Sequence, residues 1–376
     1  MRYSRSGKHM NGLSLVELMV SMVIALVVLA GVIQSFIASK KSFIQESEVA
    51  YIQENARFAI DLLSRDIRQA GNWGCSGSGD IANALSSNLN SLVKSSAVEG
   101  FEGGVSALPV YLTTADTNTD ALIVRYGDTN NQQTVLQHNN SASPPSIVTV
   151  NPHTFTAGEV MILSDASCDQ AGMFAANGIT ASSLSHNADG NNCANLLSGT
   201  FECGNCTSTS SCSSGSVGDV GATGNGAQYS AGSTLLPFVA NAYFIDESTF
   251  DSSLPALHRV FINGTSGGVT QRTTEELVSG VEDMQISYGV DNDSVADGQA
   301  NRYYSADQIS PNDIATTASG NIGWDRVVSV RFQLVMRSRN IVLPKNNTTA
   351  YLGNTPADRY LRQIVSSTVQ LRNAGL

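Results

Sequence analysis

The stretch that decides the fold begins Gly12-Leu13-Ser14-Leu15-Val16-Glu17 and continues as an apolar run to Ala38. A short basic leader, residues 1–12, precedes it, and Glu17 is the one ionisable side chain between Leu13 and Ala38. A helix of this length can cross the hydrocarbon core of a bilayer. The positive charges of the leader favour its retention on the cytoplasmic side. The sequence therefore predicts a transmembrane helix over 13–38.

Two features distinguish this segment from an ordinary secretory signal peptide. The small residue, Gly12, precedes the apolar region, whereas a signal peptide carries its cleavage site after that region. A carboxylate within the membrane, here Glu17, is unfavourable by a few kcal/mol or more. Such a charge indicates a functional role and requires a partner. A signal anchor with a chance glutamate is the alternative interpretation.

These residues resemble the type IV prepilin signature, in which Gly is followed by an apolar residue, Ser or Thr, Leu, any residue and Glu. The resemblance implies that a prepilin peptidase cuts between Gly12 and Leu13 and methylates the new amine of Leu13. It implies that Glu17 pairs with the amine of a neighbouring subunit during assembly, which would offset the cost of burying its charge. Leu13 departs from the pattern, because Phe or Met is more usual there.

The helix is expected to continue to Gly71, giving one helix over 13–71. No proline or glycine occurs between Ser42 and Ala70. Apolar residues recur there at a helical period: Val49, Ile52, Ala56, Ala59, Ile60, Leu63 and Ile67. This single stripe predicts packing on a globular head, residues 72–376. A free coiled-coil stalk is the alternative, but the stripe is too short and irregular for clean heptads.

Composition limits what the head can do. The 376-residue chain carries a net charge of −11, which argues against general nucleic-acid binding. Basic residues do gather after Gly320, but the few aromatic residues among them do not form the regular series that a stacking platform for bases needs. We therefore expect this basic region to pack on acidic parts of the chain or of neighbouring subunits, and we expect no nucleic-acid partner.

The cysteines number six, and the membrane anchor places them outside the cytoplasm, where disulfides persist. We predict disulfides, with the connectivity open; the candidates are Cys75, Cys168, Cys193, Cys203, Cys206 and Cys212. A zinc site at Cys203 and Cys206 is an alternative, because the two have ligand-like spacing. A redox role for this pair is a weaker one. The segment 177–234, rich in Cys, Gly and Ser, is interpreted as a disulfide-tied insertion and spacer, with a binding surface as the alternative.

Strand patterns dominate the head, so the fold class is α+β, with a long helix on an antiparallel sheet. Alternating apolar and polar residues make Trp324–Arg339 the clearest strand, with one face open to water. Residues 275–281 are expected to form a short helix or turn. The other expected strands are 121–126, 146–150, 159–164, 239–245, 256–262, 283–288 and 364–372, and a further strand is expected to start at 173–174.

The head motifs sharpen the resemblance. Residues 120–126, 280–291, 324–328 and 369–373 resemble the PilW family of minor pilins. This implies a non-enzymatic subunit in the initiation or tip complex of a type IV pilus. The implied partners are other minor and major pilins, the prepilin peptidase and the inner-membrane assembly platform. The implied location is the inner membrane with a periplasmic head, then the pilus or cell surface, with roles in adhesion and twitching motility.

Two other functions stay open at this point. A type II secretion pseudopilin shares the leader, the cleavage and the helix. A membrane-anchored adhesin or binding protein would use its head independently of assembly. Catalysis has little support, because the histidines (His9, His138, His153, His186 and His258) form no metal pattern, and no nucleophile or phosphate-binding motif occurs.

One further cluster could hold a cofactor. Asp291, Asp293 and Asp297 gather in an expected turn, and hard cations such as calcium favour oxygen-rich loops. Their spacing is not that of an EF-hand, and a solvated turn with aspartate side chains bonded to the backbone is the alternative. We expect no cofactor, with calcium as the candidate to test.

Overall fold

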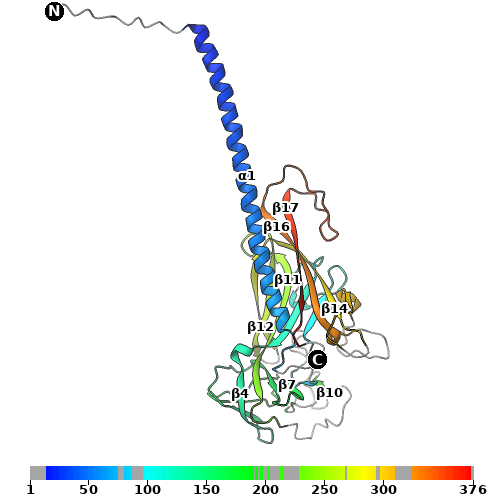
Figure 1. Cartoon of the computed structure of the whole chain (residues 1–376). Coiled ribbons are helices and arrows are strands. Elements are labelled where there is room, and N and C mark those ends of the chain that lie inside the picture. The colour runs from blue at the N-terminus through cyan, green and yellow to red at the C-terminus, as the bar shows by residue number, and fades with distance from the viewer. Residues whose placement is uncertain are drawn as a thin grey trace, which may run out of the picture.

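The computed structural model consists of one long helix whose second half packs on a β-rich head (Figure 1). It describes residues 14–74, 80–86, 96–112, 114–189, 191–193, 195, 197, 201–203, 212–214, 228–266, 269–293, 297–309 and 323–373. Gly12, Leu13, Cys75 and Cys206 lie outside the described residues.

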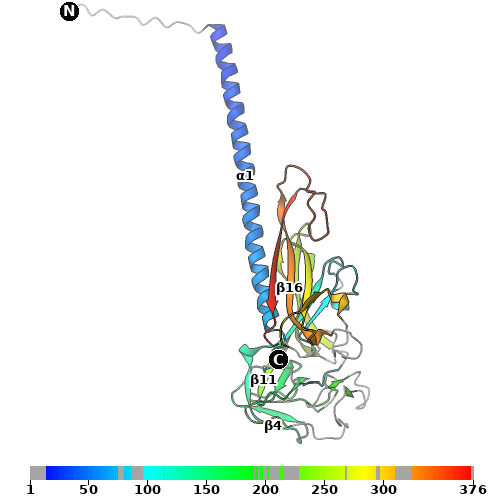
Figure 2. The same ribbon diagram turned by 45° about the vertical axis from the view of Figure 1, so that its right-hand side comes forward.

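Helix α1 runs over Leu15–Gln69, 55 residues, so it is about 80 Å long. It ends at Ala70, and Gly71 follows with a φ of +74°, the left-handed conformation that glycine adopts without strain after a helix. The last helical residue, Gln69, therefore lies close to the expected end at Gly71. Figures 1 and 2 show the first half of α1 projecting beyond the head.

The smaller sheet has four antiparallel strands in the order β15-β14-β16-β17. Their bounds are β14 Val281–Val290, β15 Arg302–Tyr304, β16 Val327–Ile341 and β17 Tyr360–Gln370. In β16 the side chains of Val330, Phe332 and Leu334 are buried while Arg331 is exposed. The predicted alternation is confirmed, although the strand starts at Val327, after the short 3₁₀ helix η5 (Trp324–Arg326).

The larger sheet has 13 strands, and its path runs β10-β9-β1-β7-β6-β11-β4-β5-β8. Strands β2, β3, β12 and β13 continue it from β11. The bounds are β1 Asp80–Asn83, β2 Val98–Phe101, β3 Ala121–Gly127, β4 Gln133–Asn139, β5 Ser146–Thr149, β6 Val160–Ser164, β7 Gln170–Ala175, β8 Ser183–Ser185, β9 Phe201–Cys203, β10 Cys212–Ser214, β11 Thr234–Glu247, β12 Pro255–Ser266 and β13 Val269–Ser279. The remaining 3₁₀ helices are η2 Val110–Leu112, η3 Thr129–Asn131 and η4 Ala306–Gln308.

Strand β11 joins the two parts of this sheet. Its first residues, Thr234–Pro237, pair with β6. Beyond Pro237 the strand changes partners, and Phe238–Tyr243 pair with β3 while Asn241–Glu247 pair with β12. One continuous strand therefore belongs to two parts of the head. Its second half lies with β3 and β12 in the part that packs on α1, and its first residues lie with β6 in the other part.

The main hydrophobic core lies between α1, the four-stranded sheet and the β3, β11 and β12 part of the larger sheet. Apolar side chains on α1 enter it at helical spacing: Ile52, Ala56, Ala59, Leu63 and Ile67. A helix stripe this well buried packs on a head, as predicted, and does not form a free stalk. A second core lies on the other face of β3 and β11 and on one face of β6 and β7. A third core lies on the opposite face of β6 and β7.

The expectation of a helix or turn at 275–281 is wrong. Residues up to Ser279 belong to strand β13, and only Gly280, with a φ of +83°, forms the turn into β14. The sequence pattern did not indicate a strand here because of its polar residues, which have partners elsewhere in the head. Glu275 pairs with Arg259 on β12, and Glu276 accepts hydrogen bonds from Ser248 and Thr249. Sequence periodicity alone cannot show such pairs.

The interpretation of 177–234 as a spacer also needs correction. The described parts of this segment include β8, β9, β10 and the start of β11. Leu184, Leu197 and Tyr229 are buried in the third core. The Tyr229 hydroxyl donates to the carbonyl oxygen of Leu197, which places these residues against each other. Part of the segment is therefore structural, because its few apolar residues complete a core.

Candidate assembly site on the exposed half of the helix

The first half of α1 is an apolar surface without cover from the head. Every residue from Ser14 to Phe43 is exposed, including the large apolar side chains of Val16, Val27 and Phe36. By length and composition the helix can cross a membrane. An apolar surface of this extent needs lipid or other helices around it.

Glu17 lies in the first turn of this helix and is exposed. Ser14 is the N-cap residue but its side chain makes no capping hydrogen bond. Among the described residues no hydrogen-bond or ion-pair partner of Glu17 is found. In an apolar environment a carboxylate in this position either takes up a proton or pairs with a group from outside the described residues. Gly12 and Leu13, the expected cleavage site, lie outside the described residues, so their roles stay predictions.

Two buried carboxylates hold the second half of α1 to the head. Glu48 accepts hydrogen bonds from the Arg339 backbone N–H (2.7 Å) and from the Asn340 side-chain amide (2.7 Å) at the end of β16. Asp66 accepts hydrogen bonds from Asn241 (2.6 Å) and Tyr243 (2.5 Å) on β11. Sequence reasoning missed both residues. The available signal was their place within the apolar stripe, four residues before Ile52 and three after Leu63.

The basic residues near the C-terminus are engaged within the chain. Arg362 pairs with Glu282 and with Asp358, and Arg337 pairs with Glu282 (3.4 Å). The guanidinium group of Arg331 lies 4.0 Å from the centre of the Tyr303 ring. These contacts fit the expectation that the basic strand face packs on acidic parts of the chain.

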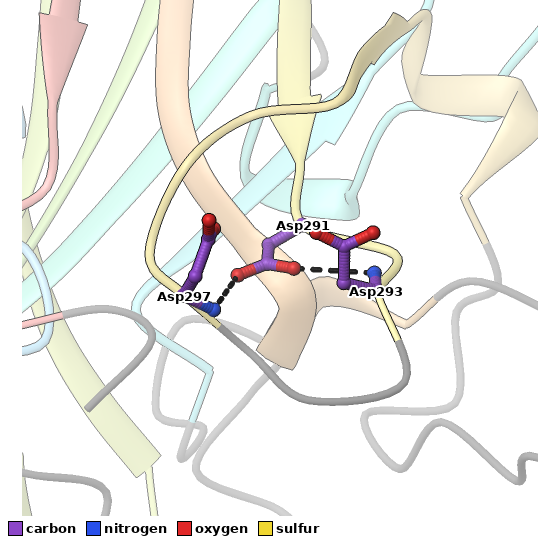
Figure 3. Close-up of side chains that lie close together, drawn as sticks. All are labelled: Asp291, Asp293 and Asp297. Carbon is purple, nitrogen blue, oxygen red and sulfur yellow. Dashed lines mark hydrogen bonds between the residues drawn. The ribbon is translucent and has the colours of Figure 1, made fainter.

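Asp291, Asp293 and Asp297 come together as the sequence predicts, with candidate ligand oxygens within 4.8 Å of one another (Figure 3). Asp291 is buried, and its carboxylate accepts N–H groups of Asp293 (3.2 Å), Asp297 (2.8 Å) and Gly298 (2.8 Å). Burial alone raises the pKa of Asp291, but these hydrogen bonds outweigh it and lower the pKa below its usual value. The turn is thus closed by aspartate-to-backbone bonds, and whether calcium binds stays a prediction.

Four of the cysteines lie among the described residues. Cys168 and Cys193 are disulfide-bonded, and the described part of the chain has no free cysteine. Cys203 and Cys212 are register partners in the antiparallel pair β9-β10. The connectivity, the zinc alternative at Cys203 and Cys206, and the disulfide tying of 177–234 all stay predictions.

A long helix with an exposed apolar half, packed by its other half on an antiparallel-rich head, is the architecture of a type IV pilin-like protein. A family model described as "Prokaryotic N-terminal methylation motif" matches residues 7–33, and one described as "Type IV Pilus-assembly protein W" matches residues 242–373. These two matches support a type IV minor pilin of the PilW family that takes part in type IV pilus assembly.

No curated protein matches the chain. Among solved structures, the type IV-like pilin TTHA1219 from Thermus thermophilus aligns with 12% sequence identity, over 59% of this chain and 87% of that chain, at a TM-score of 0.21.

Proposed function

We propose that this minor pilin acts in the complex that initiates or caps a type IV pilus. Two features of one segment carry the proposal. The first half of α1 is apolar and exposed, and it contains one carboxylate, Glu17, that has no partner among the described residues. Such a helix is suited to exchange lipid for neighbouring pilin helices. The carboxylate then selects a neighbour that offers a positive charge at the same depth.

The proposed sequence of events begins with cleavage between Gly12 and Leu13 by the prepilin peptidase, followed by N-methylation of Leu13. The new amine remains a cation after methylation, so it can pair with Glu17 of an adjacent subunit. Before assembly the helix crosses the inner membrane with the head in the periplasm. Afterwards the subunit lies in the pilus, at the cell surface.

The proposed role is structural and not enzymatic, with major pilins, other minor pilins and the inner-membrane assembly platform as partners. The buried polar groups of the head support this. Its buried carboxylates Glu48 and Asp66 bond to neighbouring strands and hold the fold.

The test is Glu17→Gln expressed in a strain that lacks the native gene. We expect pilus number to fall to the level of the deletion strain, because the amide keeps the size of the side chain and removes its charge. Glu46→Gln is the matched control, since Glu46 is an exposed carboxylate on the same helix whose described contact is with Ser42. Intact mass must first show that both variants start at N-methylated Leu13.

Each alternative function predicts a different result. If Glu17→Gln leaves pilus number unchanged and the chain is processed, the assembly role is overturned. Loss of protein secretion with normal pili would identify a type II pseudopilin. An anchored adhesin would keep its binding in the Glu17 variant, and an intact mass that includes the leader in the presence of peptidase would favour it.

A further inference from the structure

The direction of β16 relative to α1 determines which end of the head faces the membrane. Beyond the C-terminal end of α1, Gly71 lies against Asn373, which follows β17. At the other end, Glu48 bonds to Arg339 and Asn340, which directly precede Ile341, the last residue of β16. Strand β16 therefore runs antiparallel to α1, and its C-terminal end approaches the membrane helix.

The chain continues in the same direction past β16. The connection Val342–Arg359 extends the hairpin, because Val342 N–H donates to the Arg359 carbonyl oxygen (3.2 Å) and Asn347 N–H donates to that of Asp358 (2.5 Å). A turn between Tyr351 and Asn354 closes it. Figures 1 and 2 both show this β16–β17 loop rising beside α1 toward its exposed half. The loop is therefore the part of the head that points along the helix toward the bilayer.

The helix itself marks the membrane surface. Its exposed apolar run ends at Ala38, and Lys40 and Lys41 follow. Ile44 is already half-buried, and Glu48 is buried. The interval from Lys41 to Ile44 is about 5 Å of helix rise, and that to Glu48 is about 10 Å. The loop begins at the level of Glu48, so a few residues of hairpin suffice to reach the level of the lysines.

Charge at this end of the molecule is opposite to that of the whole chain. The chain carries −11, whereas residues 40–48 and 339–359 contain five basic residues, Lys40, Lys41, Arg339, Lys345 and Arg359, and three acidic ones. Of the acids, Glu48 is buried, where it pairs with Arg339 (3.9 Å) and bonds to Asn340, and Asp358 pairs with Arg362, so Lys40, Lys41, Lys345 and Arg359 remain. Beside the charges, Ile341 is 54% exposed. A cationic surface with apolar side chains, held at the depth of lipid headgroups, suits an anionic lipid surface.

We propose that the β16–β17 loop (Val342–Arg359) rests on the surface of the membrane that α1 crosses, with Lys345, Lys40 and Lys41 contacting anionic phospholipid headgroups. The proposal rests on the membrane anchoring of α1 and deepens the proposed function. The contact fixes the orientation of the head before assembly, and it is lost when the subunit leaves the bilayer for the pilus.

The test uses the full chain in lipid nanodiscs, one set of phosphatidylcholine alone and one containing phosphatidylglycerol, with hydrogen exchange of the loop amides as the readout. We expect exchange in Val342–Arg359 to be severalfold slower in the anionic discs at low salt, and this protection to vanish at high salt. Lys345→Glu should weaken the protection by at least about fivefold, because loss of one lysine near an anionic surface costs ~1 kcal/mol and the new carboxylate adds repulsion. Arg302→Glu, an exposed charge reversal on β15, should leave it unchanged.

The outcomes separate this inference from the assembly role. Equal exchange of the loop in the two kinds of disc overturns it, as does protection that Lys345→Glu leaves intact. Protection that appears only when other pilins are added would assign the loop to a protein partner, and this result would also overturn the inference of a lipid contact. None of these results changes the Glu17 experiment, because α1 is inserted in every disc and the pilus count is measured separately.

Discussion

The carboxylate of Asp66 on α1 lies 2.5 Å from the hydroxyl oxygen of Tyr243 on β11 and accepts its hydrogen bond. Both groups are buried. Burial, followed by the negative charge of Asp66, raises the pKa of Tyr243 well above its usual value, so the phenol remains a donor at all physiological pH values. The helix is thus fixed to the strand that joins the two parts of the larger sheet.

Removing this carboxylate should destabilise the head. We expect Asp66→Asn to lower the free energy of unfolding by about 1–3 kcal/mol, because a charged acceptor with two donors is replaced by a weaker one. Asp61→Asn, at an exposed position on the same helix, should change it by less than about 0.5 kcal/mol. Denaturant unfolding in detergent measures both. A double-mutant cycle with Tyr243→Phe should give a coupling energy of about 0.5–3 kcal/mol, and zero coupling would contradict the assignment.

The buried pair Arg125–Glu99 allows a contrast with a surface pair. The side chain of Arg125 is fully buried, with its guanidinium 2.5 Å from Glu99, and it also donates to Ser96. Arg125→Met should cost about 3–5 kcal/mol, because Glu99 is left as an uncompensated charge. The half-exposed pair of Arg259 with Glu275 is the control, and Arg259→Met should cost about 1 kcal/mol or less. Equal losses in thermal or denaturant unfolding would refute the contrast.

Two buried histidines should make the stability of the head depend on pH. The Nε2 atoms of His138 and His186 lie 3.0 Å apart. Burial lowers the pKa of His138 to about 4, and burial together with the charge of His138 lowers that of His186 to about 3. The unfolded chain binds these protons near pH 6.5. Stability is therefore full above about pH 6.5 and falls as the pH drops toward about 4, by up to about 1.4 kcal/mol per pH unit for each histidine.

The variant His186→Gln tests this, because its amide oxygen can still accept from His138. We expect its unfolding free energy to fall less steeply than that of the parent between about pH 7 and pH 5.

Asp120 makes the stability of the head depend on pH in the opposite sense. Burial raises its pKa to about 6, so the stability that it contributes is present at low pH and is lost as the pH rises through that value. Asp120 is common to both proteins, so the difference in slope reports the histidine. Parallel slopes would contradict the prediction.

The aspartate turn should fold without an ion. The oxygens of Asp291 already accept three backbone N–H groups, so we expect the melting temperature to be the same with excess calcium and with a chelator. Asp291→Asn should lower it in both conditions, because one oxygen acceptor is lost. A calcium-dependent rise that Asp293→Asn abolishes, with magnesium as the control ion, would instead establish a calcium site.

The sequence was most informative where one period extends over many residues. The apolar run to Ala38, the stripe from Ile52 to Ile67 and the alternation in β16 predicted the helix, its packing and the clearest strand. Each of these patterns follows from burial on one face, which periodicity reports directly. The clustering of Asp291, Asp293 and Asp297 was also predictable, because the three are close in the sequence.

Long-range polar contacts were not predictable in the same way. Strand β13 was missed because Glu275 and Glu276 are stabilised by partners on other segments. The His138–His186 pair and the Asp66–Tyr243 bond join positions far apart in the sequence, and no local pattern marks them. The packing of Leu184, Leu197 and Tyr229 was hidden by the polar residues around them, since a core can be completed by isolated side chains.

The bonds of Glu48 and Asp66 also determine how the molecule would respond to mechanical tension. They bracket the buried stretch of α1, one toward each end of the adjoining head. A pull on the helix along its axis acts parallel to β16, so the two anchors and the apolar stripe between them resist as a set in shear. They cannot be opened one after another as in peeling. We expect a subunit built in this way to transmit a pull on its helix to the head before the head unfolds.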